Sequence, residues 1–325
     1  MPELPEVEYV ARQLRQTLPG RTISDVCVNW PRTVAHPDSQ TFSAELPGAR
    51  VLDIDRRAKF LLLYLSGEQA LIIHRRMTGN LLLLPAAADN DSWKDVPDPY
   101  CRAAFLLDDG RRLVFTDPRK FGRIALYSMS ELPAALDGLG LEPLSDDFTP
   151  TALARLLAGR SRQIKPLLLD QTGIAGIGNI YADESLFRAG IHPLRRAETL
   201  TPEEITRLHA AIRAVLELGI EHGGTTFGRH QDIWGEAGRN RDHLAVYKRA
   251  GAPCLRCGTP LVRMVIAQRS THFCPACQPS AEPGIPLPQN SGRKKLGDKE
   301  RTVISREQPD QREGEGLFSK APRPI

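Results

Sequence analysis

Four cysteines near the end of the chain constrain its fold more than any other feature. Cys254 and Cys257 form one Cys-x2-Cys pair, and Cys274 and Cys277 form a second pair after sixteen intervening residues. In an intracellular protein this spacing is typical of a tetrahedral zinc site rather than of two disulfides. Because four thiolates fill the coordination sphere, we predict one structural zinc ion that stabilises a fold and takes no part in chemistry.

The first half of the chain contains two patterns of apolar residues, one after the other. Apolar residues at helical spacing predict an amphipathic helix over residues 5–18. From about residue 22 to 128, short segments rich in Val, Ile and Leu alternate with Gly, Pro, Asp and Asn. Regular short segments of this kind indicate strands of an antiparallel sandwich or barrel.

The second half is predicted to be helical. Thr201-Pro202-Glu203-Glu204 forms a capping box, which predicts a helix over residues 202–221 that ends at Gly223-Gly224. We therefore expect an α+β multidomain protein. The predicted parts are an N-terminal helix and antiparallel β-sandwich (1–130), a linker (131–150), a helical domain (151–243), the cysteine module (244–279) and a disordered tail (280–325).

Composition excludes some classes of protein. The 325 residues are 41% hydrophobic and 25% charged, which is typical of a globular protein of two or three domains. The apolar runs are far shorter than the ~18 residues that span a bilayer. Residues 1–18 carry charges where a signal peptide has an apolar core, so we expect a cytoplasmic protein. The net charge of +4 permits a nucleic-acid partner without showing one.

The first residues suggest a nucleophile. Removal of Met1 would leave Pro2 as a secondary amine, which can form an iminium with a carbon such as C1′ of deoxyribose. Glu3 could then donate a proton to the sugar ring oxygen. Proline and glutamate are also ordinary in a first helical turn, so these residues alone leave both interpretations open.

Several motifs together resemble the formamidopyrimidine-DNA glycosylases, which are bifunctional base-excision repair enzymes. The resemblance extends through most of residues 1–278. It rests on the start Pro2-Glu-Leu-Pro-Glu-Val-Glu and on Arg56-Arg57-Ala58-Lys59, His74-Arg75-Arg76-Met77-Thr78-Gly79, Asp117-Pro118-Arg119-Lys120-Phe121-Gly122, Ile164-Lys165-Pro166, Gly176-Ile177-Gly178-Asn179-Ile180-Tyr181, Gly223-Gly224-Thr225-Thr226 and Ala267-Gln268-Arg269 within the cysteine module.

The resemblance implies a role for each catalytic candidate. Pro2 matches the Schiff-base nucleophile, Glu3 the proton donor, and Lys59 the lysine of β-elimination. Arg269 matches the arginine at the tip of a zinc-bound hairpin, which acts in δ-elimination and phosphate contact. From the residues alone, Lys59 would be an edge charge on a strand and Arg269 a solvated turn residue.

The resemblance also implies damaged double-stranded DNA as partner, a helix-two-turn-helix element in the helical domain, a zinc-finger β-hairpin and a monomer. Met77, Arg119 and Phe121 match the triad inserted where the lesion nucleotide is everted. The alternative for Met77 and Phe121 is a place in the core at strand ends. The other implied DNA-binding residues are His74, Tyr100, Arg160, Lys165 and Asn179. For the basic residues Arg160 and Lys165, the alternative is a solvated helix face.

Departures from the family pattern leave the lesion open. Arg75 and Arg76 stand where the family has Leu-Gly, which predicts two extra cations beside the inserted triad. Tyr100 lies where a histidine is common, and the loop Phe227 to Asp242 lacks the family's lesion-reading pattern. We expect removal of oxidised purines, with an endonuclease VIII-like preference for oxidised pyrimidines as one alternative. A non-catalytic DNA-binding zinc protein is the alternative from another class.

Overall fold

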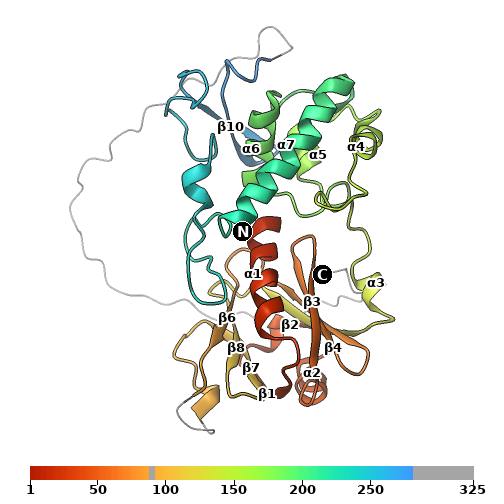
Figure 1. Ribbon diagram of the computed structural model, residues 1–325, viewed down its shortest axis with the longest axis vertical. Coiled ribbons are helices and arrows are strands. Elements are labelled where there is room, and N and C mark those ends of the chain that lie inside the picture. The colour runs from red at the N-terminus through yellow and green to blue at the C-terminus, as the bar shows by residue number, and fades with distance from the viewer. Residues whose placement is uncertain (88–91, 281–325) are drawn as a thin grey trace, which may run out of the picture.

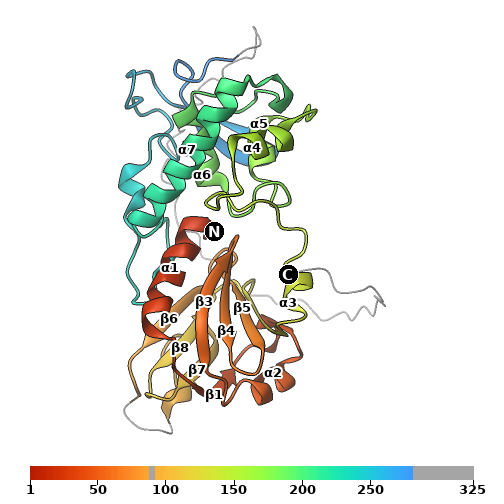
Figure 2. The ribbon, with the colours of Figure 1, turned by 45° about the vertical axis from the view of Figure 1, so that its right-hand side comes forward.

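The computed structural model describes residues 1–87 and 92–280, so all but the first residue of the predicted tail lies outside the described residues. Two halves are stacked along the long axis, with the N-terminal helix α1 (Leu4–Thr17) reaching from one to the other (Figures 1 and 2). Within the described ranges, no helix has the length and apolarity that a bilayer crossing requires.

Helix α1 has its first turn built by two glutamates. Glu3 is the N-cap residue, and its backbone N–H donates to Glu6 Oε2 over 2.7 Å in a capping box. Pro5 fits the first turn, where no backbone donor is needed. The predicted helix is confirmed, and its apolar side is buried from Val7 to Leu14.

The N-terminal half is a sandwich of two sheets, as predicted. One sheet has the strand order β2-β9-β5-β4-β3 and the other the order β1-β7-β8-β6. The strands are β1 (Ile23–Val28), β2 (Val34–His36), β3 (Val51–Arg57), β4 (Phe60–Leu65), β5 (Gln69–His74), β6 (Asn80–Leu84), β7 (Cys101–Leu107), β8 (Arg112–Thr116) and β9 (Arg123–Ser128).

Two elements of this half escape sequence analysis. Strand β2 pairs in parallel with β9, whereas the other strand pairs described in both sheets are antiparallel. Three residues are too few to show the alternation that predicts a strand. Helix α2 (Ser39–Glu45), capped by the Asp38 carboxylate, is similarly too short to show a helical period.

The second half packs helices around its own core. Its elements are α3 (Leu132–Ala135), α4 (Pro150–Leu157), α5 (Ile164–Leu168), α6 (Asn179–Ala189), α7 (Pro202–Glu221) and the hairpin β10 (Val262–Ile266) with β11 (Arg269–Phe273). The capping box of α7 is confirmed, because Glu204 N donates to Thr201 Oγ1 over 3.2 Å and Thr201 N donates to Glu204 Oε2 over 2.9 Å.

Each of the two hydrophobic cores contains one residue from the other half of the chain. Leu4 of α1 is buried in the core of the second half, and Ile233, from the loop after α7, is buried in the core of the sandwich. Apolar contact therefore joins the halves at two separate points.

Glu142, in the segment between the halves, connects that segment to the sandwich through hydrogen bonds. Its carboxylate accepts hydrogen bonds from Arg56 Nη1 at 2.7 Å, from Arg57 Nη1 at 3.0 Å and from the backbone N–H of Ala58. Arg56 is also paired with Glu8 at 2.9 Å. These two arginines neutralise carboxylates of their own chain, so they hold the turn before β4 in place rather than offering charge to a phosphate.

Replacement of Glu142 by Ala should lower the free energy of unfolding by about 2 kcal/mol. It leaves Arg57 without its carboxylate partner and leaves Arg56 paired with Glu8 alone. Breaking a fully buried pair costs about 3–5 kcal/mol. The Glu142 side chain retains 17% exposure, which reduces the penalty. Urea unfolding measures the change. Glu45→Ala, at an exposed position, is the control and should stay within about 0.5 kcal/mol; an equal loss in both variants would contradict this assignment.

Candidate active site and nucleic-acid interface

The carboxyl of Glu3 is held at the N-terminus of α6. Its Oε1 accepts from the backbone N–H of Ile180 at 3.1 Å and its Oε2 accepts from that of Tyr181 at 3.3 Å. Gly178 makes this approach possible, since a Cβ there would lie 2.2 Å from Glu3 Cδ. The first residues of the chain are thereby fixed against the glycine-rich turn of the other half.

Burial dominates the protonation of Glu3. Loss of water raises the pKa of its carboxyl to about 7, with the nearby negative Glu6 acting in the same direction. Lys59 and the two backbone donors of α6 act in the opposite direction. A carboxyl with this pKa holds its proton for part of the time at neutral pH, as a proton donor must.

Lys59 lies directly before β4, and its side chain is buried. Its Nζ donates to the backbone oxygen of Ile177 at 2.9 Å, one residue before the glycine that receives Glu3. Burial lowers the pKa of the ammonium, while Glu3 and Glu6 raise it. The sequence interpretation of Lys59 as an edge charge is therefore wrong, since an edge charge would be solvated.

Glu6 is a site residue that the sequence analysis did not single out; it was only one of the glutamates of a first helical turn. Its Oε1 accepts from Tyr181 Oη and from the backbone N–H of Thr225, both at 2.6 Å. With Glu3 N on the other oxygen, this carboxylate joins α1, α6 and the turn after α7. A glutamate at the third helical position was the available signal, but its distant partners leave no trace in the local sequence.

The chain begins beside these groups. Pro2 is buried, and the amino group of Met1 has its pKa lowered by burial, with Lys59 and Arg75 adding to that effect. Glu3 and Glu6 act against it. An amine in this position is thus held nearer its uncharged, nucleophilic form. Pro2, Glu3 and Lys59, predicted to act together, are brought together.

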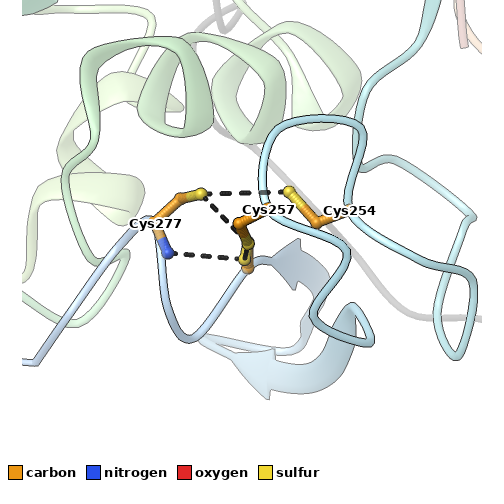
Figure 3. A group of neighbouring side chains, drawn as sticks. Cys254, Cys257 and Cys277 are labelled. Atoms are coloured by element: carbon orange, nitrogen blue, oxygen red, sulfur yellow. Dashed lines mark hydrogen bonds between the residues drawn. The ribbon is translucent and has the colours of Figure 1, made fainter.

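The four cysteines converge as a metal site requires (Figure 3). Their ligand atoms all lie within 4.8 Å of one another, and the Sγ atoms of Cys257 and Cys274 are 3.5 Å apart. Tetrahedral zinc with Zn–S bonds near 2.3 Å puts sulfur atoms about 3.8 Å apart. The four thiolates fit one structural zinc ion, as predicted.

The zinc-site hairpin is anchored to the helices by a buried ion pair. Lys165 Nζ lies 2.6 Å from Asp183 Oδ1 and donates to Ser270 O at 2.8 Å. The other carboxylate oxygen of Asp183 accepts from His272 N at 2.9 Å. The Lys165 side chain has no exposed surface, so the prediction that it contacts DNA directly is wrong. Its positive charge is neutralised by Asp183 inside the protein.

Arg269 lies where β11 begins, after the turn residues Ala267 and Gln268, and its side chain is exposed. Its positive charge contributes to lowering the pKa of the Lys59 ammonium. Asn179 Nδ2 donates to Ser270 O at 2.9 Å and so helps to hold the same hairpin. Phosphate contact by Arg269 and Asn179 stays a prediction.

The three residues of the predicted inserted triad meet on the surface. Met77 is 43% exposed and Phe121 is 46% exposed, which excludes the alternative that they are core residues. Arg119 Nη1 lies 3.3 Å from Met77 Sδ, and its guanidinium lies 4.7 Å from the centre of the Phe121 ring. Two apolar side chains and one cation thus project from adjacent turns.

Buried Asp117 holds these two turns together. Its Oδ2 accepts from the backbone N–H of Gly122 at 2.6 Å, and its Oδ1 accepts from that of Arg119 at 3.2 Å and from Thr78 Oγ1. Gly122 is required here, because a Cβ would lie 2.4 Å from the ring of Phe115.

The remaining predicted contacts fall into two groups. Arg160 is exposed, and Tyr100 is partly exposed with the Arg229 guanidinium 5.2 Å from its ring centre. His74 is buried; its Nδ1 accepts from Arg76 N at 3.0 Å, and burial lowers its pKa to about 3. Arg75, expected as a surface cation, is also buried, so only Arg76 of that pair lies at the surface.

Family models match three parts of the chain. They are the formamidopyrimidine-DNA glycosylase N-terminal domain over residues 1–124, the formamidopyrimidine-DNA glycosylase H2TH domain over residues 139–231, and a zinc finger found in FPG and IleRS over residues 251–279. The order of the three matches follows the sandwich, the helices and the cysteine hairpin.

Comparison with whole proteins agrees with the family models. Formamidopyrimidine-DNA glycosylase of Herpetosiphon aurantiacus is 47% identical over 86% of this chain and 100% of its own length, and that of Chloroflexus aurantiacus is 50% identical over 86% and 98%. The solved complex of Lactococcus lactis Fpg with abasic-site DNA has a TM-score of 0.78 at 34% identity, over 86% of this chain and 100% of that chain. The chain therefore belongs to the formamidopyrimidine-DNA glycosylase family.

Proposed function

We propose that this protein is a base-excision repair DNA glycosylase and abasic-site lyase that removes oxidised purines. The observation that carries the proposal is the burial of Glu3, at the start of the chain, and of Lys59, directly before β4. An exposed group of Met77, Arg119 and Phe121 on the sandwich supports it. A non-catalytic DNA-binding protein has no need to bury these two ionisable groups against an amine.

In the proposed reaction, the amine of Pro2, freed by removal of Met1, attacks C1′ of the damaged nucleotide. The bond from C1′ to the base breaks, and the base leaves with the electron pair and takes up the proton that the attacking amine loses. Glu3 donates its proton to the ring oxygen as the sugar opens. The product is an iminium between Pro2 and the sugar. Loss of a proton from C2′ then expels the 3′ phosphate, with Lys59 assisting this β-elimination, and Arg269 assists the later δ-elimination that expels the 5′ phosphate.

The partner in this proposal is damaged duplex DNA, as in the solved Fpg complexes that this chain resembles. A lesion must leave the base stack to reach an amine buried at the junction of the two halves. Met77 and Phe121 would fill the gap, and Arg119 would hydrogen-bond the orphaned base. We also propose that the protein acts as a monomer in the cytoplasm.

An endonuclease VIII-like preference for oxidised pyrimidines is the second candidate. It is favoured by the loop after Thr226, which lacks the family pattern and is fastened to the sandwich by Ile233. Single-turnover rates on otherwise identical duplexes with 8-oxoguanine, formamidopyrimidine or thymine glycol separate the two. A faster rate on thymine glycol would replace the purine proposal.

Borohydride should trap the processed protein on lesion DNA as a covalent adduct. Because the iminium forms at the secondary amine, mass spectrometry of the digested adduct should place the sugar fragment on the peptide that begins with Pro2. Pro2→Gly should trap less efficiently. An adduct on Lys59, or equal trapping by Pro2→Gly, would remove Pro2 from the mechanism.

Glu3 should make stability depend on pH. Its pKa is about 7 in the folded protein against an ordinary value of 4.5, so the folded state keeps a proton that the unfolded state loses between these values. Stability should therefore fall as pH rises from 4.5 to 7 by about 3 kcal/mol more than in Glu3→Gln, and should level off above pH 7. Urea unfolding at several pH values tests this; parallel curves would contradict it.

Removal of zinc should abolish DNA binding while leaving the amine intact. A hairpin of two five-residue strands is not stable by itself, so the segment carrying Arg269 should lose its position. Chelation should raise the Kd for lesion DNA at least tenfold at fixed salt, and added zinc should restore it. Cys27→Ser, outside the cluster, is the control. Full affinity in metal-free protein would contradict the structural role.

A further inference from the structure

The turn between β8 and β9 carries a lysine that the proposed reaction does not use. Lys120 lies between Arg119 and Phe121 in the chain and is exposed, and its Nζ lies 3.8 Å from the centre of the Trp30 ring. Arg119 instead contacts Met77 and the Phe121 ring. Neighbouring side chains of one turn therefore contact two different places, the inserted triad and Trp30.

The backbone of the turn fixes Lys120 in this arrangement. Lys120 has a φ of 59°, in the left-handed region that few residues other than glycine adopt. Its N–H donates to Asp117 O at 3.3 Å, and its backbone oxygen accepts from Arg123 Nη1 at 3.2 Å. Asp117 is the same buried residue that holds the two turns of the triad together. Lys120 and the triad thus share one support.

Trp30 is fixed from the opposite side of the contact. Its N–H donates to Arg102 O of β7 at 3.2 Å, and its backbone oxygen accepts from Thr33 N at 2.9 Å. It is the residue before a single turn of 3-10 helix (Pro31–Thr33), and its side chain is partly exposed. A fixed indole ring attracts the Lys120 ammonium and restricts its motion, so less entropy is lost when the ammonium contacts a further group.

The surface around this pair is positively charged. The cations that adjoin Lys120 or Trp30 in the chain or contact them are exposed or partly exposed, and they are Arg32, Arg119 and Arg123. Within residues 1–87 and 92–280, no carboxylate forms an ion pair with Lys120 or with these three arginines. Positive charge that the protein does not neutralise attracts a partner with repeated negative charges, such as a nucleic-acid backbone.

The position of Arg119 indicates which strand of a duplex lies nearest to Lys120. In the proposed function, on which this inference rests, Arg119 hydrogen-bonds the base that is orphaned when the lesion leaves the stack. The orphaned base belongs to the strand opposite the lesion. Because Lys120 directly follows Arg119 and contacts Trp30 instead of the triad, the backbone phosphates nearest to it are those of that opposite strand.

We propose that Lys120 and Trp30 form a preformed phosphate contact for the DNA strand opposite the lesion. The Lys120 ammonium binds one backbone phosphate near the orphaned base. Trp30 is a positioning residue, which holds the ammonium in place before DNA arrives. Phosphate contacts fix the register of a protein on a duplex without reading its sequence, so this contact holds the opposite strand while the damaged nucleotide is turned out of the stack.

The salt dependence of binding tests for the loss of one phosphate contact. The Kd for a duplex with an uncleavable abasic-site analogue is measured between about 0.05 and 0.2 M salt, where each phosphate contact contributes about 0.9 to the slope of log Kd against log salt concentration. Lys120→Gln should lower this slope by about 0.9 and raise the Kd about eightfold at about 0.1 M salt. Lys120→Arg, which keeps the charge, should restore the slope. Trp30→Leu should raise the Kd by a smaller factor and leave the slope unchanged.

Neutral backbone substitutions in the DNA test which strand is contacted. A single methylphosphonate, which removes the charge of one phosphate, is placed in turn at each phosphate beside the orphaned base and at each phosphate beside the lesion. At one position on the opposite strand it should raise the Kd of the wild-type protein but not that of Lys120→Gln. The two changes are not additive there, because the variant has already lost that contact.

Lys94→Gln is the matched control. Lys94 Nζ also lies near an indole ring, 5.3 Å from the centre of Trp93, but it is paired with Asp25 Oδ2 at 3.5 Å. Its replacement should leave the slope unchanged. An unchanged slope in Lys120→Gln, or a methylphosphonate effect confined to the lesion strand, would overturn the inference. Wild-type protein that binds undamaged DNA equally well and forms no adduct with borohydride would instead overturn the proposed function, so the two failures are distinct.

Discussion

The structure depends on one contact, the carboxyl of Glu3 at the N-terminus of α6. Two backbone donors of α6 hold it, and Gly178 leaves the space that it occupies. The partial positive charge of a helix N-terminus favours the ionised carboxylate, while burial favours the neutral acid. Burial is the larger effect, so one interaction both joins the two halves and leaves a carboxyl able to donate a proton near neutral pH.

Several positively charged side chains are paired or enclosed within the protein itself. Arg56 and Arg57 pair with Glu8 and Glu142, Lys165 pairs with Asp183, and Arg75 is enclosed by carbonyl oxygens. The cations of these internal pairs are not available to DNA, although the sequence alone does not distinguish them from exposed ones. Exposed Arg119, beside two exposed apolar side chains, is the better indicator of an interface, because no carboxylate in residues 1–87 or 92–280 forms an ion pair with it.

Sequence analysis succeeded where the signal is local. The helix over 4–17, the capping box at Thr201 and the spacing of the four cysteines each depend on residues close together in the chain, and all three are confirmed. It failed for β2 and α2, which are too short to show a period, and for Lys165, whose partner Asp183 lies in another helix. A burial that arises from contacts distant in sequence has no local signature, so both the resemblance and the alternative of a solvated helix face placed Lys165 at the surface.

Two departures from the family pattern that are far apart in the sequence are in contact in the structure. Arg75 differs from the family pattern in one half of the chain, and the loop from 227 to 242 differs in the other. In the structure the Arg75 guanidinium donates to the backbone of that loop at Gln231. A buried cation needs hydrogen-bond acceptors, and the loop provides one at Gln231 O. A loop needs fixed contacts to keep one conformation, and the Arg75 guanidinium provides one. The two departures are therefore physically linked, because the buried guanidinium helps to fix the conformation of the loop.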